Sequence, residues 1–228
     1  MAFQPIVSVR DRTITAYEAL MRSTDQAMGR PDLMLGAAER LGRLDDLGRA
    51  VRSAVAKDAS RAPAGIRLFV NLHAQDLSDE TLFDPSAPLS QIASRVVLEI
   101  TERASLDHIT DLQERIGRLR GLGYRIAVDD LGAGYAGLSA LALLEPDVVK
   151  LDMTIARDID ASATRQHIVR SMAGLCTGMK MELLAEGVET GAERDTLVAC
   201  GCDVLQGYHF GRPAFGFESI PSDRWGPQ

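Results

Sequence analysis

Eight short runs of apolar and β-branched residues recur along the chain, and seven of them carry an acidic, amide or lysine side chain near one end. Runs of this kind, bounded by turn residues, are typical of buried strands. Stretches with the apolar spacing of helices separate the later runs, at 31–56, 111–123, 164–178 and 191–201. This alternation indicates a parallel α/β fold. The predicted strands are 3–9, 13–20, 66–72, 95–101, 124–131, 147–152, 182–187 and 203–208.

The position of the polar strand ends decides between an open sheet and a closed barrel. Adjacent strands lie about 4.8 Å apart, so seven strands of an open sheet would spread their ends over roughly 29 Å. Closing eight strands into a barrel brings these ends to one opening. Only the first two strands are joined closely, by a hairpin-like turn at Asp11 and Arg12. If the polar ends act together, the fold is a barrel with an antiparallel first pair.

Composition and charge exclude several classes of protein. The net charge is −7 without a Lys/Arg run, which argues against binding to a DNA or RNA polymer. No window approaches the roughly 18 apolar residues of a membrane segment. The amino terminus lacks the layout of a signal peptide, so we expect a cytoplasmic protein. Without a linker or low-complexity tract, the chain is predicted to be one domain over 1–228.

The strand-end residues predict a site for two metal ions. Five acidic side chains in one opening repel each other strongly. Two divalent cations and one lysine balance these five charges. Ligands that are all oxygen atoms suit Mg²⁺ or Mn²⁺ rather than zinc, and paired hard cations are suited to phosphodiester hydrolysis. The residues are Glu18, Asn71, Glu99, Asp129, Asp130, Lys150, Glu186 and Gln206.

A second pattern, GAGYAG at 132–137, matches the G-x-G-x-x-G spacing of dinucleotide-binding loops and follows a predicted strand. Asp152 ends the next strand, where a ribose-binding acid would lie. Against NAD binding, Asp129 and Asp130 directly precede the first glycine and would repel a pyrophosphate. The motif also lies too far along the chain to be followed by two mononucleotide halves. We interpret the glycines as turns of a loop between strand and helix.

Seven motifs, in this order, resemble those of the EAL-domain family, named for the Glu-Ala-Leu found here at 18–20. They are YEALMR (17–22), VNL (70–72), LEITE (98–102), DDLGAGY (129–135), VKLD (149–152), AEGVE (185–189) and QGYHFGRP (206–213). The resemblance covers 3–213 and leaves 214–228 as a C-terminal tail. It implies a single (β/α)8 TIM-like barrel with an antiparallel first strand. It also implies a homodimer that hydrolyses cyclic di-GMP to linear pGpG with two Mg²⁺ or Mn²⁺ ions.

The resemblance also implies a role for each matching residue. One metal is expected to be bound by Glu18, Asn71, Glu99 and Asp129, and the second by Asp129, Asp130 and Glu186. Lys150 matches the lysine at the attacking water, Glu186 is a candidate general base, and Glu102 matches the glutamate that anchors the loop after Asp130. The expected substrate contacts are Gln4, Leu20, Arg22 on a phosphate, and Gln206. Asp152 and Glu189 match acids that support the ligands.

Three departures from the family pattern leave an alternative open. His73 stands where the family often has Ser, Leu131 replaces Phe, and Ala136-Gly137 replaces a Ser-Ser pair. None of these is an expected metal ligand, but two fall in the loop 131–137, which links metal site and dimer interface in the family. The alternative function is therefore a receptor that binds cyclic di-GMP with weak or no hydrolysis.

Overall fold

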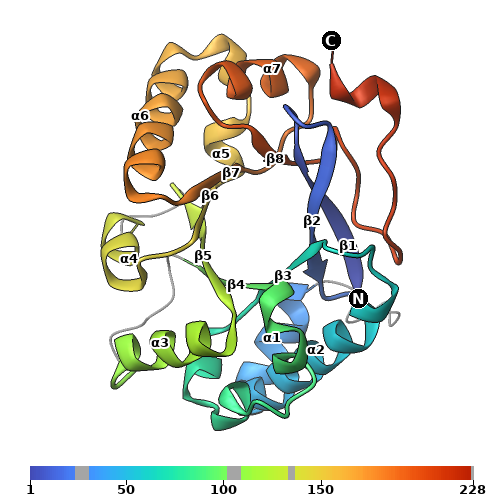
Figure 1. Cartoon of the computed structure of the whole chain (residues 1–228), viewed down its shortest axis with the longest axis vertical. Helices are drawn as coiled ribbons and strands as arrows, with labels where there is room; N and C mark the ends of the chain where they lie inside the picture. The colour runs from blue at the N-terminus through green and yellow to red at the C-terminus, as the bar shows by residue number, and fades with distance from the viewer. Residues whose placement is uncertain (24–30, 102–108, 133–136, 227–228) are drawn as a thin grey trace.

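The computed structural model describes residues 1–23, 31–101, 109–132 and 137–226, and its eight strands form a closed barrel (Figure 1). Every predicted strand is present, with ends within two residues of the prediction, which confirms the barrel over the open sheet. The strands are β1 (Ala2–Ser8), β2 (Thr13–Leu20), β3 (Arg67–Asn71), β4 (Val96–Thr101), β5 (Arg125–Leu131), β6 (Val148–Leu151), β7 (Glu182–Ala185) and β8 (Val204–Gln206).

The first strand runs against all the others. β1 pairs antiparallel with both β2 and β8, while each pair from β2–β3 to β7–β8 is parallel. The hairpin turn between β1 and β2 contains Arg12 at a φ of 52°. Because β1 is reversed, its beginning lies where the other strands end, and Gln4 is paired with Glu18. We call this end of the barrel, at which β2 to β8 finish, the mouth.

The helices lie outside the barrel (Figure 1). They are α1 (Pro31–Arg40), α2 (Leu44–Asp58), α3 (Leu112–Leu122), α4 (Gly137–Leu144), α5 (Met153–Ala156), α6 (Ala163–Met179) and α7 (Gly191–Ala199). The predicted helical stretch 31–56 is two helices, separated at Gly42, whose φ is 62°. The alternation of strand and α-helix is interrupted between β3 and β4. There, residues 72–95 contain three 3-10 helices, Ala74–Ser78, Glu80–Phe83 and Ser90–Arg95. Within the described ranges, no helix is both long and apolar enough to cross a membrane.

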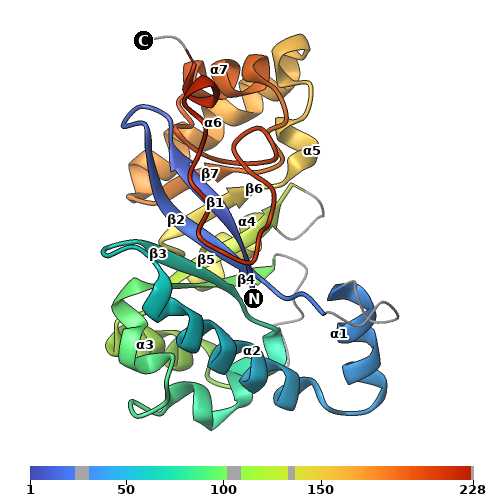
Figure 2. The same ribbon diagram turned by 90° about the vertical axis from the view of Figure 1, so that its right-hand side faces the viewer.

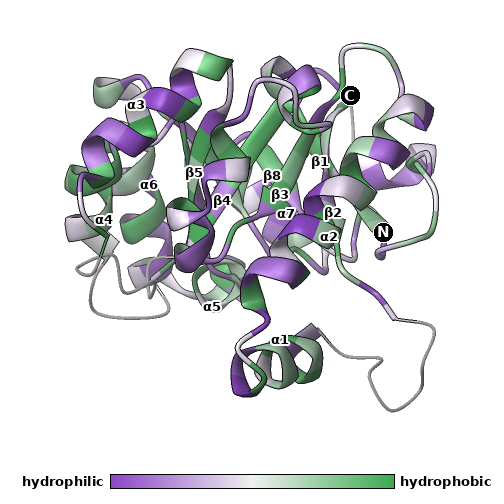
Figure 3. Cartoon of the chain, turned by 90° about the horizontal axis from the view of Figure 1, so that it is seen from below, coloured by the Kyte–Doolittle hydropathy of each residue, from purple (hydrophilic) through white to green (hydrophobic). Residues whose placement is uncertain are grey.

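Two peripheral segments differ from a regular barrel. Helix α1 stands away from the barrel and has no buried residue (Figure 2). In Figure 3, where hydrophobic strands occupy the centre of the molecule, α1 again lies apart from them. The segment 207–226 contains turns, an isolated bridge from Ala214 to Phe3 and the 3-10 helix Ser222–Trp225, and it packs against the first hairpin. There Phe217 packs against Phe3 and Tyr17, with ring centroids 4.3 and 5.1 Å apart. The Tyr17 hydroxyl donates to the Glu218 carbonyl at 2.8 Å.

We expect Gly207→Ala, directly after β8, to destabilise the barrel. A Cβ at this position would lie 2.1 Å from the Val188 carbonyl oxygen and 2.3 Å from its nitrogen. Both Val188 groups are engaged, the nitrogen donating to Gln206 and the carbonyl accepting from His209. Separating these backbones should cost about 3 kcal/mol in the free energy of unfolding, measured in urea. The matched control is Gly174→Ala on α6, which meets nothing within 4 Å. Equal stability of the two variants would contradict this contact.

Candidate active site

The residues predicted to act together lie in one layer at the mouth. Below this layer, the barrel is filled by Ile6, Ala16, Phe69, Val97, Ala127, Val148 and Leu184, with the partly buried Val204 packed against them. Side chains alternate along a strand, so the residue two positions nearer the mouth points the same way. This rule selects Gln4, Glu18, Asn71, Glu99, Asp129, Lys150, Glu186 and Gln206. The layer therefore follows from the two-residue alternation of side chains on each of the eight strands.

Lys150 lies at the centre of the layer and is almost fully buried, with its side chain 1% exposed. Its Nζ is 2.6 Å from Glu186 Oε1 and 2.9 Å from Asp129 Oδ1. The same nitrogen forms an ion pair with Glu99 and lies 3.9 Å from Glu18 Oε2. One ammonium group thus contacts carboxylates from four different strands or strand ends. We call Lys150 and these four carboxylates the lysine cluster.

Side-chain amides fix the orientation of Glu18. Asn71 Nδ2 donates to Glu18 Oε1 at 3.0 Å, and Gln206 Nε2 donates to Glu18 Oε2 at 2.7 Å. Gln206 Nε2 is also 3.2 Å from Gln4 Oε1, and Gln4 Nε2 donates to the Gly211 carbonyl at 3.1 Å. The three amides come from β1, β3 and β8, the two neighbours of β2 and the strand beyond β1, so they surround Glu18 within the layer.

Burial and mutual repulsion change the acidity of the cluster. Burial raises the pKa of Glu99 well above its usual value, and it raises the pKa of Glu186 to about 8, with Asp129 and Glu18 adding to the effect. Burial disfavours the charged form of Lys150, but the surrounding carboxylates outweigh it and raise the pKa of the lysine well above its usual value. Without bound cations, the raised pKa values favour the protonated forms of Glu99 and Glu186, because one ammonium group does not neutralise four carboxylates.

The oxygens of the cluster suit divalent metal ions. Carboxylate oxygens of Asp129, Asp130 and Glu186 lie within 4.8 Å of one another. Glu99 Oε1 and Asp129 Oδ1 are buried against Lys150 Nζ, whereas Glu99 Oε2 is buried with no hydrogen-bond partner among the described residues. Hard cations such as Mg²⁺, Mn²⁺ and Ca²⁺ prefer such all-oxygen sites. A buried oxygen without a partner and four carboxylates around a single ammonium group both fit bound cations.

A distortion of β5 brings two consecutive aspartates to the same site. Neighbouring residues on a regular strand point to opposite faces. Asp129 and Asp130 are neighbours, yet the carboxylates of both lie close to that of Glu186. The register of β5 with β6 shifts between Val128 and Leu131, and Asp130 has a φ of 58°. This left-handed conformation costs a non-glycine residue about 1 kcal/mol or more. Such strain is typical of functional positions.

We expect Asp130→Asn to separate metal binding from folding. Asparagine adopts the left-handed conformation readily, so unfolding in urea should change by less than about 0.5 kcal/mol. Loss of a charged ligand should weaken Mn²⁺ binding roughly 10-fold or more in calorimetry. Asp130→Val is the control for the backbone, because a β-branched residue is strained at this φ and should destabilise the fold by about 2 kcal/mol. Unchanged Mn²⁺ affinity in Asp130→Asn would exclude it as a ligand.

Other predicted site residues lie outside the layer or outside the described ranges. Arg22 donates to the Met21 carbonyl at 2.8 Å. Asp152, also the candidate ribose acid of the NAD interpretation, caps α5 by accepting from Thr154 N at 2.9 Å. Glu189 forms an ion pair with Arg157. Glu102 and most of the GAGYAG loop, at 133–136, are not among the described residues.

A cavity of about 770 Å³ opens beside the layer and was not predicted from the sequence. Glu18 and Asn71 form its inner end, and Leu20 at the end of β2 also lines it. Its walls are largely apolar and come from α1, α2 and the end of β3, through Leu35, Leu44, Leu47, Val51 and Leu72. The apolar spacing of 31–56 contains these residues, but the spacing alone does not distinguish a cavity wall from a packed core. We call this space the leucine cavity.

Comparisons with known proteins agree with this barrel and its mouth. The EAL domain model matches residues 1–213. Cyclic di-GMP phosphodiesterase NbdA of Pseudomonas aeruginosa is 32% identical over 221 residues, covering 92% of this chain and 28% of that protein. The calcium/cy-diGMP complex of Klebsiella pneumoniae BlrP1 has a TM-score of 0.83 at 31% identity, covering 96% of this chain and 57% of that one. A standalone versatile EAL protein from Vibrio cholerae O395, bound to c-di-GMP, has a TM-score of 0.79 at 27% identity, covering 100% and 97%.

The match extends over nearly the whole chain, whereas the curated relatives are longer. This chain spans 26–44% of the length of the relatives it matches. The match over 1–213, the closed barrel with its reversed first strand and the motif residues gathered at its mouth agree with one another. The chain belongs to the EAL-domain family.

Proposed function

We propose that the chain hydrolyses cyclic di-GMP to linear pGpG with two divalent cations, Mg²⁺ or Mn²⁺, at the mouth of the barrel. The observation that carries the proposal is the lysine cluster, in which four carboxylates surround one buried ammonium group. The names of NbdA and of the c-di-GMP complexes support the substrate. The calcium and manganese complexes of BlrP1 support a divalent cation.

The residues of the layer have different roles in the proposed reaction. Bound cations supply Lewis-acid activation of a water and neutralise charge at the phosphodiester. Lys150 stays protonated, since its pKa is raised well above the usual value, and donates a hydrogen bond to the attacking oxygen. Glu186, whose Oε1 lies 2.6 Å from Lys150 Nζ, is the candidate general base.

Substrate contacts come from the rim of the layer. Gln4 and Gln206 face the cluster from β1 and β8, and Leu20 lines the leucine cavity. Arg22, two residues after β2, has the planar guanidinium that suits a phosphate. Asp152 and Glu189 act from outside the layer. The role of Glu102 and a homodimer remain predictions from the family.

Incubation of the chain with cyclic di-GMP and either Mg²⁺ or Mn²⁺, followed by chromatography, tests this function. We expect pGpG with at least one of the metals and none when EDTA removes them. Absence of pGpG with both metals, despite measurable binding of cyclic di-GMP, would instead support the receptor function.

A further inference from the structure

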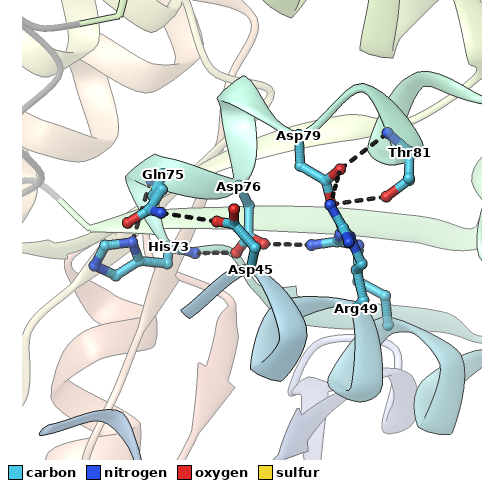
Figure 4. Close-up of polar contacts among 8 residues, drawn as sticks. Asp45, Arg49, His73, Gln75, Asp76, Asp79 and Thr81 are labelled. Carbon is cyan, nitrogen blue, oxygen red and sulfur yellow. Dashed lines mark hydrogen bonds and ion pairs between the residues drawn. The ribbon is translucent and has the colours of Figure 1, made fainter. Parts of the chain in front are cut away.

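One side chain in the leucine cavity is a hydrogen-bond donor with a fixed direction. His73, two residues after Asn71, is exposed and lines the cavity at the start of the 3-10 helix Ala74–Ser78. Its own Nδ1 accepts from Gln75 N at 3.2 Å, and its backbone N donates to Asp76 Oδ2 at 3.0 Å (Figure 4). Because Nδ1 accepts, the ring proton lies on Nε2. Among the described residues, that N–H has no hydrogen-bond acceptor.

Buried ion pairs hold the turn that carries His73. From α2, Arg52 pairs with both Asp76 and Asp79, and Arg49 donates twice to Asp79, at 2.9 and 3.0 Å. Figure 4 shows the Arg49 side chain reaching from α2 to Asp79 on the turn. The approach is so close that a Cβ on Gly48 would lie 2.0 Å from Asp76 Oδ1. The backbone at His73 therefore has little freedom, and its ring is presented to the cavity in a set position.

The other polar groups lining the cavity are less suited to select a ligand. The Asn71 amide donates to Glu18, and the Gln75 amide donates to Asp45 at 2.9 Å. Both Asp76 oxygens are engaged, one by Arg52 and one by the His73 backbone. The hydroxyls of Ser78 and Thr101 can donate as well as accept, so they do not distinguish an acceptor from a donor on a ligand. The His73 Nε2–H can only donate.

We propose that His73 is a specificity-determining residue that donates Nε2–H to O6 of a guanine held in the leucine cavity. The apolar walls suit the face of a nucleobase, while the metal-binding layer at the inner end suits the adjoining phosphodiester. At the contacted edge guanine presents two acceptors, O6 and N7, whereas adenine presents a donor in place of O6. A fixed donor therefore favours guanine. This inference rests on the proposed function, because it assumes a cyclic dinucleotide in the site.

His73→Ser is the test variant, because serine is a good helix N-cap but does not extend into the cavity. Dissociation constants for cyclic di-GMP and cyclic di-AMP are measured by calorimetry in Ca²⁺, or by competition where binding is weak. Relative to the unmodified chain, we expect cyclic di-GMP binding to weaken roughly 5- to 10-fold, the loss of one neutral hydrogen bond. Cyclic di-AMP binding should change less than about 2-fold. Mn²⁺ affinity and the thermal midpoint should not change.

The control variant is Gln75→Ala, which removes another side chain from the same cavity wall and should leave the ratio of the two dissociation constants unchanged. Equal weakening for both dinucleotides in His73→Ser, or no weakening, would overturn the inference while hydrolysis by the unmodified chain upheld the proposed function. If the unmodified chain neither binds nor cleaves cyclic di-GMP, the proposed function fails and the inference fails with it.

Discussion

Lys150→Met is expected to lower kcat for cyclic di-GMP by roughly 10³-fold or more, the size of effect seen when a charge aimed at the transition state is removed. Lys150 is the one cation among the described residues that contacts Glu99, Asp129 and Glu186. Methionine has a similar length without the charge or the donor. Cyclic di-GMP should still bind, because its expected contacts are Gln4, Leu20, Arg22 and Gln206 and do not include Lys150. Single-turnover assays of pGpG release with Mn²⁺ measure the loss.

The same substitution should reveal a second role for Lys150 in the metal-free chain. Without the ammonium group, several buried carboxylates lose the positive charge that lies among them, which typically costs 3–5 kcal/mol. Divalent cations would neutralise the same carboxylates. We therefore expect Mn²⁺ to raise the thermal midpoint more in Lys150→Met than in the unmodified chain. The exposed Lys57→Met on α2 is the matched control and should alter neither kcat nor the response to Mn²⁺. A kcat above about a tenth of normal would remove Lys150 from the mechanism.

Much of this site could be predicted because a strand imposes a period of two. Once the strands are known, interior residues such as Phe69 and Val97 determine which neighbours, Asn71 and Glu99, face the mouth. The apolar runs identify the strands, and the clustered charges favour a closed barrel. Asp130 is the exception: strand alternation alone would turn it away from Asp129. Its place among the carboxylates depends on the irregular register and left-handed φ at the end of β5.

Contacts between distant segments could not be predicted from local patterns. The glycine at position 48 looks unfavourable in the middle of a helix, and only the approach of Asp76 explains it. Arg49 and Arg52, three residues apart on α2, face Asp76 and Asp79, three residues apart on the turn after β3. The two arginines and the two aspartates have the same three-residue spacing, which is compatible with pairing. Charged residues with this spacing are, however, common on solvent-exposed surfaces. Nothing in the local sequence indicated that these two sets meet in a buried interface.

We expect Arg52→Met to destabilise the fold by about 3–5 kcal/mol, because it leaves two buried aspartates with too little positive charge. The Arg52 side chain is 8% exposed, and those of Asp76 and Asp79 are 5% and 2% exposed. The thermal midpoint should fall by roughly 10 °C for a chain of this size. Urea unfolding at pH 7 gives the free energy directly. The matched control is Arg49→Met: Arg49 is 49% exposed, and its loss leaves Arg52 in contact with Asp79, so we expect a much smaller loss of stability.

The dependence of stability on pH distinguishes the two aspartates. Hydrogen bonds from Arg49, with further ones from Thr81, hold the pKa of Asp79 well below its usual value, despite burial. A lowered pKa stabilises the fold above the unfolded value of about 4, and this stability is lost as pH falls below it. Burial instead raises the pKa of Asp76, although Arg52 lowers it in part, so protonation of Asp76 favours the fold. Without Arg52, both pKa values should rise, and the cost of the substitution should shrink from pH 7 to pH 4. A cost that stays constant over this range would show that Arg52 stabilises the interface by packing rather than by charge.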